Sequence, residues 1–244
     1  MPVWREFLFD TETTVTAYHK LRQLPFGFLL ESVLGGEQWA RYSFMGTRPR
    51  SAWKLSGSSV EWWTPQDGWK PLDVSDPMED LDRRLAAERP VQVPGLPRFW
   101  GGAVGYFGYD MVRRIERLPE PPEDDLGLPE AMVMFTDVVV AIDNLKGTAT
   151  AICPVPVEDG EDPGSLREKH AAALARLDAL VETLARVPGP DPLRLLPEPD
   201  EDPPFRSSMA REDFEAAVER IREYIFAGDA FQVVLSQRLE MGLD

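Results

Sequence analysis

Cysteine and histidine are scarce in this chain, which has only Cys153, His19 and His170. One cysteine cannot form an internal disulfide, and three such residues are too few for a zinc cluster of cysteine and histidine. The sequence also lacks the GxxxxGKS/T phosphate loop, the GxSxG nucleophile elbow and the HExxH metal motif. These absences exclude chemistry based on soft metal ligands and the common signatures of nucleotide-binding enzymes, serine hydrolases and zinc proteases.

Long apolar runs and basic residues are scarce as well. No apolar run approaches the roughly 20 residues of a membrane span, and Glu6 and Asp10 stand where a secretory signal would be apolar. Only 26 Lys and Arg stand against 42 Asp and Glu, so the formal net charge is −16. Such a charge repels a phosphate backbone. We expect a soluble cytoplasmic protein that binds neither nucleic acid nor a membrane.

What the chain does have is a large apolar content, because 43% of its 244 residues are hydrophobic. This is enough to bury the core of one domain or of two small ones. The spacing of apolar residues predicts helices over residues 14–24, 78–88, 165–186 and 211–228. Runs rich in apolar and β-branched residues predict a hairpin over 26–46 and strands over 51–57, 59–64, 68–72, 131–144, 146–155 and 230–240.

A proline-rich acidic stretch divides the chain. Seven prolines between Pro188 and Pro204 prevent a helix or a central strand, and so predict a linker. We expect a domain over 1–187, a linker over 188–206 and the start of a second domain over 207–244. About 40 residues rarely close a core alone, so we expect a truncated chain. The predicted fold class is α+β, with packed antiparallel β-sheets and flanking helices.

The segment GGAVGYFG, which contains Gly101, Gly102, Gly105 and Gly108, superficially resembles a nucleotide-binding loop. A dinucleotide fingerprint needs its glycines between a strand and a helix, whereas valine and aromatic residues interleave them here and favour a strand. Glycines within a strand permit a bulge or the close approach of another backbone. We therefore predict a structural role for this segment.

Two small groups of polar residues are candidate binding residues. Glu31 and Ser32 end an apolar strand, and Arg41 lies across the predicted hairpin, so together they could contact the ammonium and carboxylate of an amino acid. Spacing alone favours an ordinary surface ion pair. Gln232 and Ser236 fall on one side of the last predicted strand, where they could face a polar cavity or, equally well, solvent.

Three stretches together resemble the anthranilate synthase component I family and its close relative, aminodeoxychorismate synthase component I. LPFGFLLESVLGGEQWARYSFMG resembles the family's N-terminal regulatory hairpin, and PRFWGGAVGYFGYDMVRRIE resembles its glycine-aromatic strand and following helix. REYIFAGDAFQVVLSQRLE resembles the beginning of its chorismate-binding domain. The resemblance runs from about Thr13 to Leu239, apart from the linker, and implies an α+β fold of packed sheets with helices outside.

The resemblance implies an enzyme that converts chorismate to anthranilate and pyruvate, with Mg²⁺ as cofactor. It also implies ammonia supplied from glutamine by an amidotransferase subunit, component II, and feedback inhibition by L-tryptophan. The family's LLES motif falls on residues 29–32, so Ser32 is expected to contact tryptophan, with Leu30, Glu31 and Arg41 completing the effector site. The catalytic residues and Mg²⁺ ligands are expected beyond residue 244, so this chain alone is expected to be inactive.

Three alternatives stay open from the sequence. The first is an aminodeoxychorismate or isochorismate-type relative, although the LLES and RYSF motifs favour the anthranilate branch. The second is a noncatalytic module that binds tryptophan or a partner subunit, and the third is a β-rich interaction domain without a ligand. One departure from the family concerns stability: Ala210 stands where relatives often have a Ser or Thr helix cap, which costs about 1 kcal/mol unless Ser208 substitutes.

Overall fold

The computed structural model describes residues 1–31, 41–121, 123–192 and 204–242. The chain divides into two compact units, Met1–Asp191 and Pro192–Asp244, and the boundary falls within the proline-rich stretch. The domain limits predicted at residues 187 and 207 stay a prediction. The mixture of helices and antiparallel sheets confirms the predicted α+β class. No helix among the described residues has both the length and the apolarity needed to cross a membrane.

The first sheet of the larger unit has the strand order β1-β10-β9-β3-β2, and all neighbouring strands are antiparallel. Its strands are β1 (Pro2–Leu8), β10 (Thr148–Pro154), β9 (Val138–Asp143), β3 (Tyr42–Thr47) and β2 (Gly27–Leu30). The pairing of β2 with β3 confirms the two arms of the predicted hairpin. Its turn lies outside the described residues. The predicted return strand after residue 146 is β10, paired with β9.

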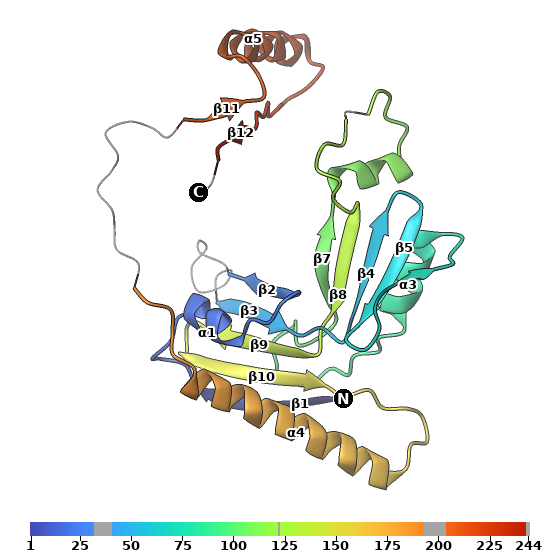
Figure 1. Ribbon diagram of the computed structural model, residues 1–244, viewed down its shortest axis with the longest axis vertical. Coiled ribbons are helices and arrows are strands. Elements are labelled where there is room, and N and C mark those ends of the chain that lie inside the picture. The colour runs from blue at the N-terminus through green and yellow to red at the C-terminus, as the bar shows by residue number, and fades with distance from the viewer. Residues whose placement is uncertain (32–40, 122, 193–203, 243–244) are drawn as a thin grey trace. The chain divides into compact units, whose positions relative to one another are not determined.

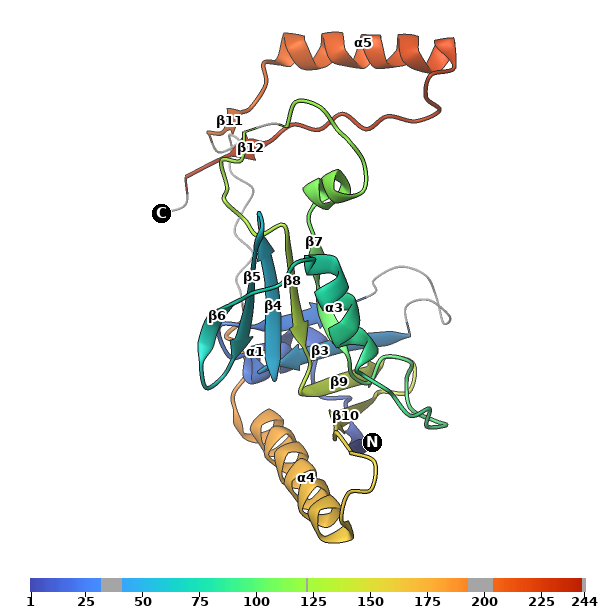
Figure 2. The same cartoon turned by 90° about the vertical axis from the view of Figure 1, so that its right-hand side faces the viewer.

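Helices α1 (Thr14–Leu21) and α4 (Pro163–Arg186) cover one face of this sheet (Figures 1 and 2). Alternate strand residues such as Met45 and Val140 point to that face and pack against Ala17 of α1 and Leu177 of α4. Side-chain caps begin both helices: Thr13 accepts from a backbone N–H of α1, and Asp162 accepts from two backbone N–H groups of α4. This face therefore forms the main core of the unit.

The second sheet has the order β6-β5-β4-β8-β7, again antiparallel throughout. Its strands are β6 (Gly68–Leu72), β5 (Ser59–Thr64), β4 (Ser51–Ser56), β8 (Ala131–Phe135) and β7 (Ala103–Phe107), and α3 (Pro77–Ala86) packs on it. Trp53 is fully buried there beside Leu81 of α3. The indole N–H of Trp53 donates to the buried carboxylate of Asp80, at 3.2 Å. Arg84 donates to the same carboxylate, at 2.8 Å, so this buried charge is paired.

The prediction of one strand over 131–144 was wrong. The run forms two strands, β8 and β9, which belong to different sheets. They separate at Thr136 and Asp137, where the Thr136 backbone N–H donates to the carbonyl of Gly102, at 2.9 Å, and not to a strand of either sheet. The chain therefore crosses from one sheet to the other at this point. It makes a second crossing between β3 and β4, where Arg48 has a φ of 53°.

The glycine-aromatic segment forms β7 at the edge of the second sheet, followed by a 3-10 helix over Tyr109–Arg114. An ideal Cβ built on Gly105 would lie 2.0 Å from the carbonyl oxygen of Met132 and 2.6 Å from the Cα of Val133. Only a residue without a side chain permits this approach of β7 to β8. The structural role that the sequence predicts for this segment is confirmed.

The smaller unit contains α5 (Arg211–Ala227) and a pair of two-residue strands, β11 (Arg206–Ser207) and β12 (Leu239–Glu240). Helix α5 ends as predicted, at Gly228, whose φ is 87°. Its cap residue Ala210 makes no side-chain cap bond, and the Ser208 hydroxyl accepts instead from the backbone N–H of Arg238. Ser208 therefore does not replace the missing cap.

The strand predicted over residues 230–240 was also wrong, because only Leu239 and Glu240 are in a strand. A strand needs a hydrogen-bonded neighbour, and among the described residues of this unit the only pairing partner is the two-residue β11. Gln232 and Ser236 are consequently exposed and lie on no sheet face. The choice between a polar cavity and solvent for these two residues stays open.

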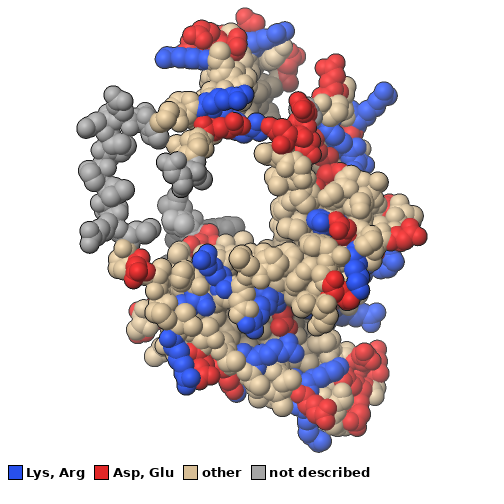
Figure 3. All heavy atoms as spheres, viewed as in Figure 1, with Lys and Arg blue, Asp and Glu red and all other residues tan. Residues whose placement is uncertain are grey.

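Charged side chains of both signs are interspersed on the face shown in Figure 3. Local ion pairs among the described residues include Arg5 with Asp178 at 2.9 Å and Arg176 with Asp137 at 2.7 Å. The acidic excess of the sequence does not gather into one large patch on this face.

Candidate functional site

The residues predicted to bind an amino acid lie at the open end of the hairpin formed by β2 and β3. Leu30 is the last residue of β2, Glu31 follows it, and Arg41 immediately precedes β3. Ser32 lies outside the described residues. The antiparallel register pairs Leu30 with Phe44, so the two arms stay in contact up to the end of β2.

Leu30 lies beside a layer of aromatic side chains on the sheet face opposite to α1 and α4. Opposite residues of an antiparallel pair share a face, so Leu30 shares one with Phe44. The ring of Phe44 meets that of Phe99 edge-on, with centroids 5.4 Å apart, and Phe28 lies 6.2 Å from Phe99. We call Phe28, Phe44 and Phe99 the aromatic layer. Leu30 is 47% exposed, so the border of this layer offers apolar surface to a ligand.

Glu31 points to the other side of the sheet, as strand alternation requires. Its carboxylate accepts a hydrogen bond from the hydroxyl of Thr14, the first residue of α1. Thr14 is buried, and this contact joins the end of β2 to the helix. Glu31 and Leu30 are therefore neighbours in sequence whose side chains contact different layers of the unit.

Arg41 forms an ion pair with Asp143, the last residue of β9. Its Nη2 donates to Oδ2 at 2.6 Å and its Nε lies 3.1 Å from both carboxylate oxygens. The guanidinium also stacks over the ring of Tyr42, 5.0 Å from its centroid. The side chain of Asp143 is 9% exposed and that of Arg41 is 31% exposed. Arg41 is thus ion-paired, but its partner is Asp143 and not Glu31.

The hydrogen bond from Arg41 holds the pKa of Asp143 below its ordinary value. Burial opposes this shift, and the backbone N–H groups of Lys146 and Leu145 reinforce it. Asp143 is therefore a fixed anion at neutral pH that holds the guanidinium at the end of the hairpin. The result is a partly exposed cation held at the end of the hairpin.

Comparison with known proteins gives this arrangement a context. The sequence pattern of the family described as chorismate binding enzyme matches residues 36–244. The chain belongs to this family. The resemblance seen in the sequence is therefore confirmed, and the chorismate binding family is a family of enzymes.

Individual members of the chorismate binding family match the whole chain. The protein of Pseudomonas putida named anthranilate synthase component 1 is 41% identical over 99% of this chain and 48% of its own length. The protein of the same name from Mycobacterium tuberculosis (strain ATCC 25618 / H37Rv) is 38% identical over 100% of this chain and 47% of its own length. The chain therefore spans about half the length of the curated relatives it matches.

A solved structure of the same kind supports the fold. The crystal structure of anthranilate synthase component I from Streptococcus pneumoniae TIGR4 aligns with a TM-score of 0.61 and 27% sequence identity. The match covers 96% of this chain and 48% of that chain. The packed antiparallel sheets described above are therefore an arrangement known in this family.

The Arg41–Asp143 pair gives a first testable prediction. Asp143→Asn keeps an oxygen that can accept from Leu145 and Lys146 but removes the charge, so we expect a loss of about 1.5 kcal/mol in the free energy of unfolding at pH 7. The folded pKa of Asp143 is lowered, so the stabilisation is present above the unfolded value, about 3.9, and disappears as pH falls through the folded value. Urea unfolding of parent and variant between pH 7 and pH 2 measures this.

The matched control is Asp178→Asn, because Asp178 pairs with Arg5 at 2.9 Å but its side chain is 60% exposed. An exposed ion pair contributes little, so this variant should match the parent at every pH. A stability difference for Asp143→Asn that stays constant down to pH 2 would contradict the assigned pKa shift.

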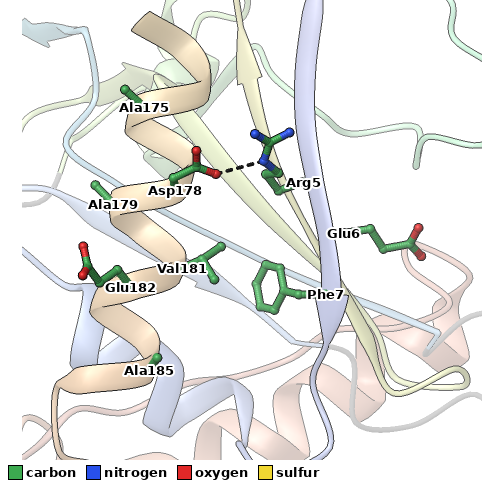
Figure 4. Close-up of a pocket in the computed structure, with 9 residues that line it drawn as sticks. All are labelled: Arg5, Glu6, Phe7, Ala175, Asp178, Ala179, Val181, Glu182 and Ala185. Carbon is green, nitrogen blue, oxygen red and sulfur yellow. Dashed lines mark hydrogen bonds and ion pairs between the residues drawn. The ribbon is translucent and has the colours of Figure 1, made fainter. Parts of the chain in front are cut away.

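One cavity of this chorismate binding family member lies elsewhere, between β1 and α4. It has a volume of ≈ 570 Å³. Figure 4 shows Arg5 and Asp178 joined across it, Phe7 facing Val181, and Glu6 pointing away. Its basic side chain is already paired and much of the helix side is alanine, so it presents little that would orient a ligand. Leu30, Glu31 and Arg41 do not line it.

Two further features of this family member bear on ligand binding, namely its possible metal ligands and a second cavity. Among residues 1–31, 41–121, 123–192 and 204–242, no group of three or more His, Cys, Asp or Glu is placed to hold a metal ion. A second cavity lies where the two sheets meet and contains Arg48, Arg50 and Arg176. The sequence analysis missed these arginines because they come from separate segments and match no motif.

Proposed function

We propose that this chain is the N-terminal part of an anthranilate synthase component I, which converts chorismate and ammonia to anthranilate and pyruvate in tryptophan biosynthesis. The observation that carries the proposal is the match of the entire chain to proteins named anthranilate synthase component 1, at 34–41% identity. The relatives are about twice as long. The catalytic residues are proposed to lie in the part that this chain does not span, so the chain alone is inactive.

The role proposed for the larger unit is feedback inhibition by L-tryptophan at the open end of the hairpin. Leu30 and the border of the aromatic layer provide an apolar surface for an indole ring. Arg41, held by Asp143, provides a cation for the amino acid's carboxylate. Glu31 and Ser32 follow directly after Leu30 and are proposed to complete the site through polar contacts.

The other components of the reaction are proposed to act on the whole protein. Chorismate is the proposed substrate, and a glutamine amidotransferase subunit, component II, is the proposed source of ammonia, both in the cytoplasm. The described residues do not fit a Mg²⁺ site, because they contain no cluster of carboxylates placed to hold the ion. We therefore assign the Mg²⁺ ligands to the part of the relatives outside this chain.

The folate-branch enzyme, aminodeoxychorismate synthase component I, is the alternative within the same family. Every relative named above is an anthranilate synthase component, including the solved structure. No observation on the described residues favours the folate branch, so the anthranilate branch is the stated proposal.

Calorimetric titration of L-tryptophan into the chain tests the effector role. We expect the parent to bind, and Ser32→Ala to bind at least about tenfold more weakly, because a lost hydrogen bond to a charged ligand group contributes about 1.5 kcal/mol or more. Ser58→Ala is the matched control, since Ser58 lies exposed in the turn between β4 and β5. A thermal melt of each protein verifies that all three are folded.

Two outcomes would count against the effector site. A folded parent that does not bind L-tryptophan contradicts the proposal that the larger unit carries the site. Equal binding by the parent and Ser32→Ala contradicts the assignment of Ser32 and leaves Leu30, Glu31 and Arg41 as the proposed determinants.

A further inference from the structure

The second cavity, which we call the junction pocket, lies where the two sheets of the larger unit meet. Its volume is ≈ 510 Å³. This is within the range of about 300–1,000 Å³ that small-molecule sites occupy. The residues that line it are Gln23, Leu24, Pro25, Phe26, Arg48, Pro49, Arg50, Trp63, Pro65, Gln66, Asp137 and Arg176.

The pocket forms because the chain crosses between the sheets twice in this region. Residues 48–50 connect β3 to β4, and Asp137 lies between β8 and β9. The turn from β5 to β6 and the middle of α4 supply further lining residues, including Arg176. Each crossing interrupts strand pairing, and the interruptions leave a space bordered by both sheets and one helix.

One wall of the junction pocket is aromatic. The ring of Phe26 meets that of Trp63 edge-on, with centroids 4.7 Å apart and planes at 66°. The ring centroid of Trp69 lies 6.0 Å from that of Phe26. Phe26 and Trp63 are only partly buried, so the wall offers apolar surface suited to a planar ring.

The charge of the pocket is opposite to that of the chain. Three of its lining residues are arginines and one is acidic, whereas the whole sequence has 26 basic and 42 acidic residues. Arg176 pairs with Asp137 at 2.7 Å, and Arg50 pairs with Glu88 just outside the lining. Arg48 donates to the side-chain oxygen of Gln23, a neutral partner. Three guanidinium groups against two carboxylates leave one positive charge uncompensated among these residues.

The backbone at Arg48 gives a reason to connect that charge with a ligand. Its φ of 53° is in the left-handed region, where glycine or asparagine is the easier residue. An arginine held in such a conformation is an outlier of the kind that gathers at ligand-binding positions. Arg48 therefore combines an unfavourable backbone conformation with a guanidinium whose partner in the pocket is the neutral side chain of Gln23.

We propose that the junction pocket binds a small aromatic carboxylate, with its ring against Phe26 and Trp63 and its carboxylate on Arg48. The planar guanidinium matches a carboxylate in shape and charge, and the aromatic wall favours a ring over a bare anion. The site is separate from the hairpin end, because Leu30, Glu31 and Arg41 do not line it. The proposal does not depend on the activity proposed above.

Calorimetric titration with benzoate tests it, together with two comparison probes. Benzamide has the ring without the charge, and acetate has the charge without the ring. We expect benzoate to bind with a Kd of a few millimolar or tighter, and both comparison probes to bind at least about tenfold more weakly. Arg48→Asn should weaken benzoate binding about tenfold, since asparagine accepts a left-handed backbone but carries no charge.

The control variant is Arg117→Asn, which removes an exposed arginine outside the pocket and should bind benzoate like the parent. Benzamide or acetate binding as well as benzoate would overturn the proposal, and so would unchanged binding by Arg48→Asn or no binding of benzoate by the folded parent. Ser32→Ala should keep benzoate binding. The junction pocket and the tryptophan site can therefore fail independently of each other.

Discussion

Gly105→Ala is expected to lower the free energy of unfolding of the larger unit by about 3 kcal/mol. The added Cβ would lie 2.0 Å from the carbonyl oxygen of Met132 and 2.6 Å from the Cα of Val133, both on β8. These are backbone atoms that no side-chain rotation can move. The edge strand β7 must therefore withdraw from β8, which weakens the ladder between them.

Urea unfolding followed by tryptophan fluorescence measures this effect. All seven tryptophans lie within the first 100 residues, so the signal reports on the larger unit. Gly189→Ala is the control, because the nearest atom to its added Cβ would be the Lys20 Cε at 4.0 Å. It should change stability by less than about 0.5 kcal/mol. Equal stabilities for the two variants would show that β7 does not approach β8 as described.

Trp53→Ala is expected to remove about 4 kcal/mol, the usual cost of truncating a fully buried tryptophan. Trp53, a residue of β4, is 0% exposed and packs against residues of β8 and α3. The substitution leaves a cavity and also deprives the buried Asp80 carboxylate of its indole donor. The same urea titration measures the loss through the remaining tryptophans.

Two further variants separate the effect of the cavity from the effect of the lost indole hydrogen bond. Trp53→Phe keeps most of the packing but not the N–H, so it should cost about 1 to 3 kcal/mol. Trp4→Ala removes a tryptophan that is 43% exposed, and it should cost less than about 1 kcal/mol. A Trp53→Ala protein as stable as Trp4→Ala would contradict the position given to the indole in the second core.

The sequence predicted correctly those helices and strands that are marked by their own apolar spacing and by turn residues at their ends. Helix α4 spans Pro163–Arg186, against a prediction of 165–186, because its apolar residues recur at helical spacing. The three strands between Ser51 and Leu72 are each bounded by turn residues and were predicted almost to the residue. The close approach at Gly105 followed from glycine's lack of a side chain.

Contacts between distant residues explain the errors. The run 131–144 is apolar almost throughout, so its division at Thr136 is decided by a hydrogen bond to Gly102 that no local pattern indicates. The run 230–240 has strand-forming residues, but among the described residues it has only the short β11 as a neighbour. Residues with high strand propensity form a strand only where neighbouring strands are present for them to pack against.

The candidate site also combines features that the local sequence predicts with contacts that it does not predict. The predicted hairpin grouped Glu31, Ser32 and Arg41, and the family resemblance added Leu30. The structure places Leu30, Glu31 and Arg41 at one end of the hairpin. Their side chains then diverge, because alternation sends Glu31 to Thr14 of α1. Asp143, the partner of Arg41, lies 102 positions further along the chain. The assignment of Ser32 and its neighbours to tryptophan stays a prediction.

The pairing of β1 with β10 has a consequence for synthesis of the protein. Residues 2–8 find their hydrogen-bonding neighbour only at residues 148–154, and α4, which covers both strands, follows later still. At about 5–20 residues per second, a ribosome needs roughly 7 to 30 seconds between making the two strands. During that interval the first segment has an unsatisfied edge and an uncovered apolar side. The larger unit is therefore expected to mature late in translation, and to depend on chaperones until its last helix has emerged.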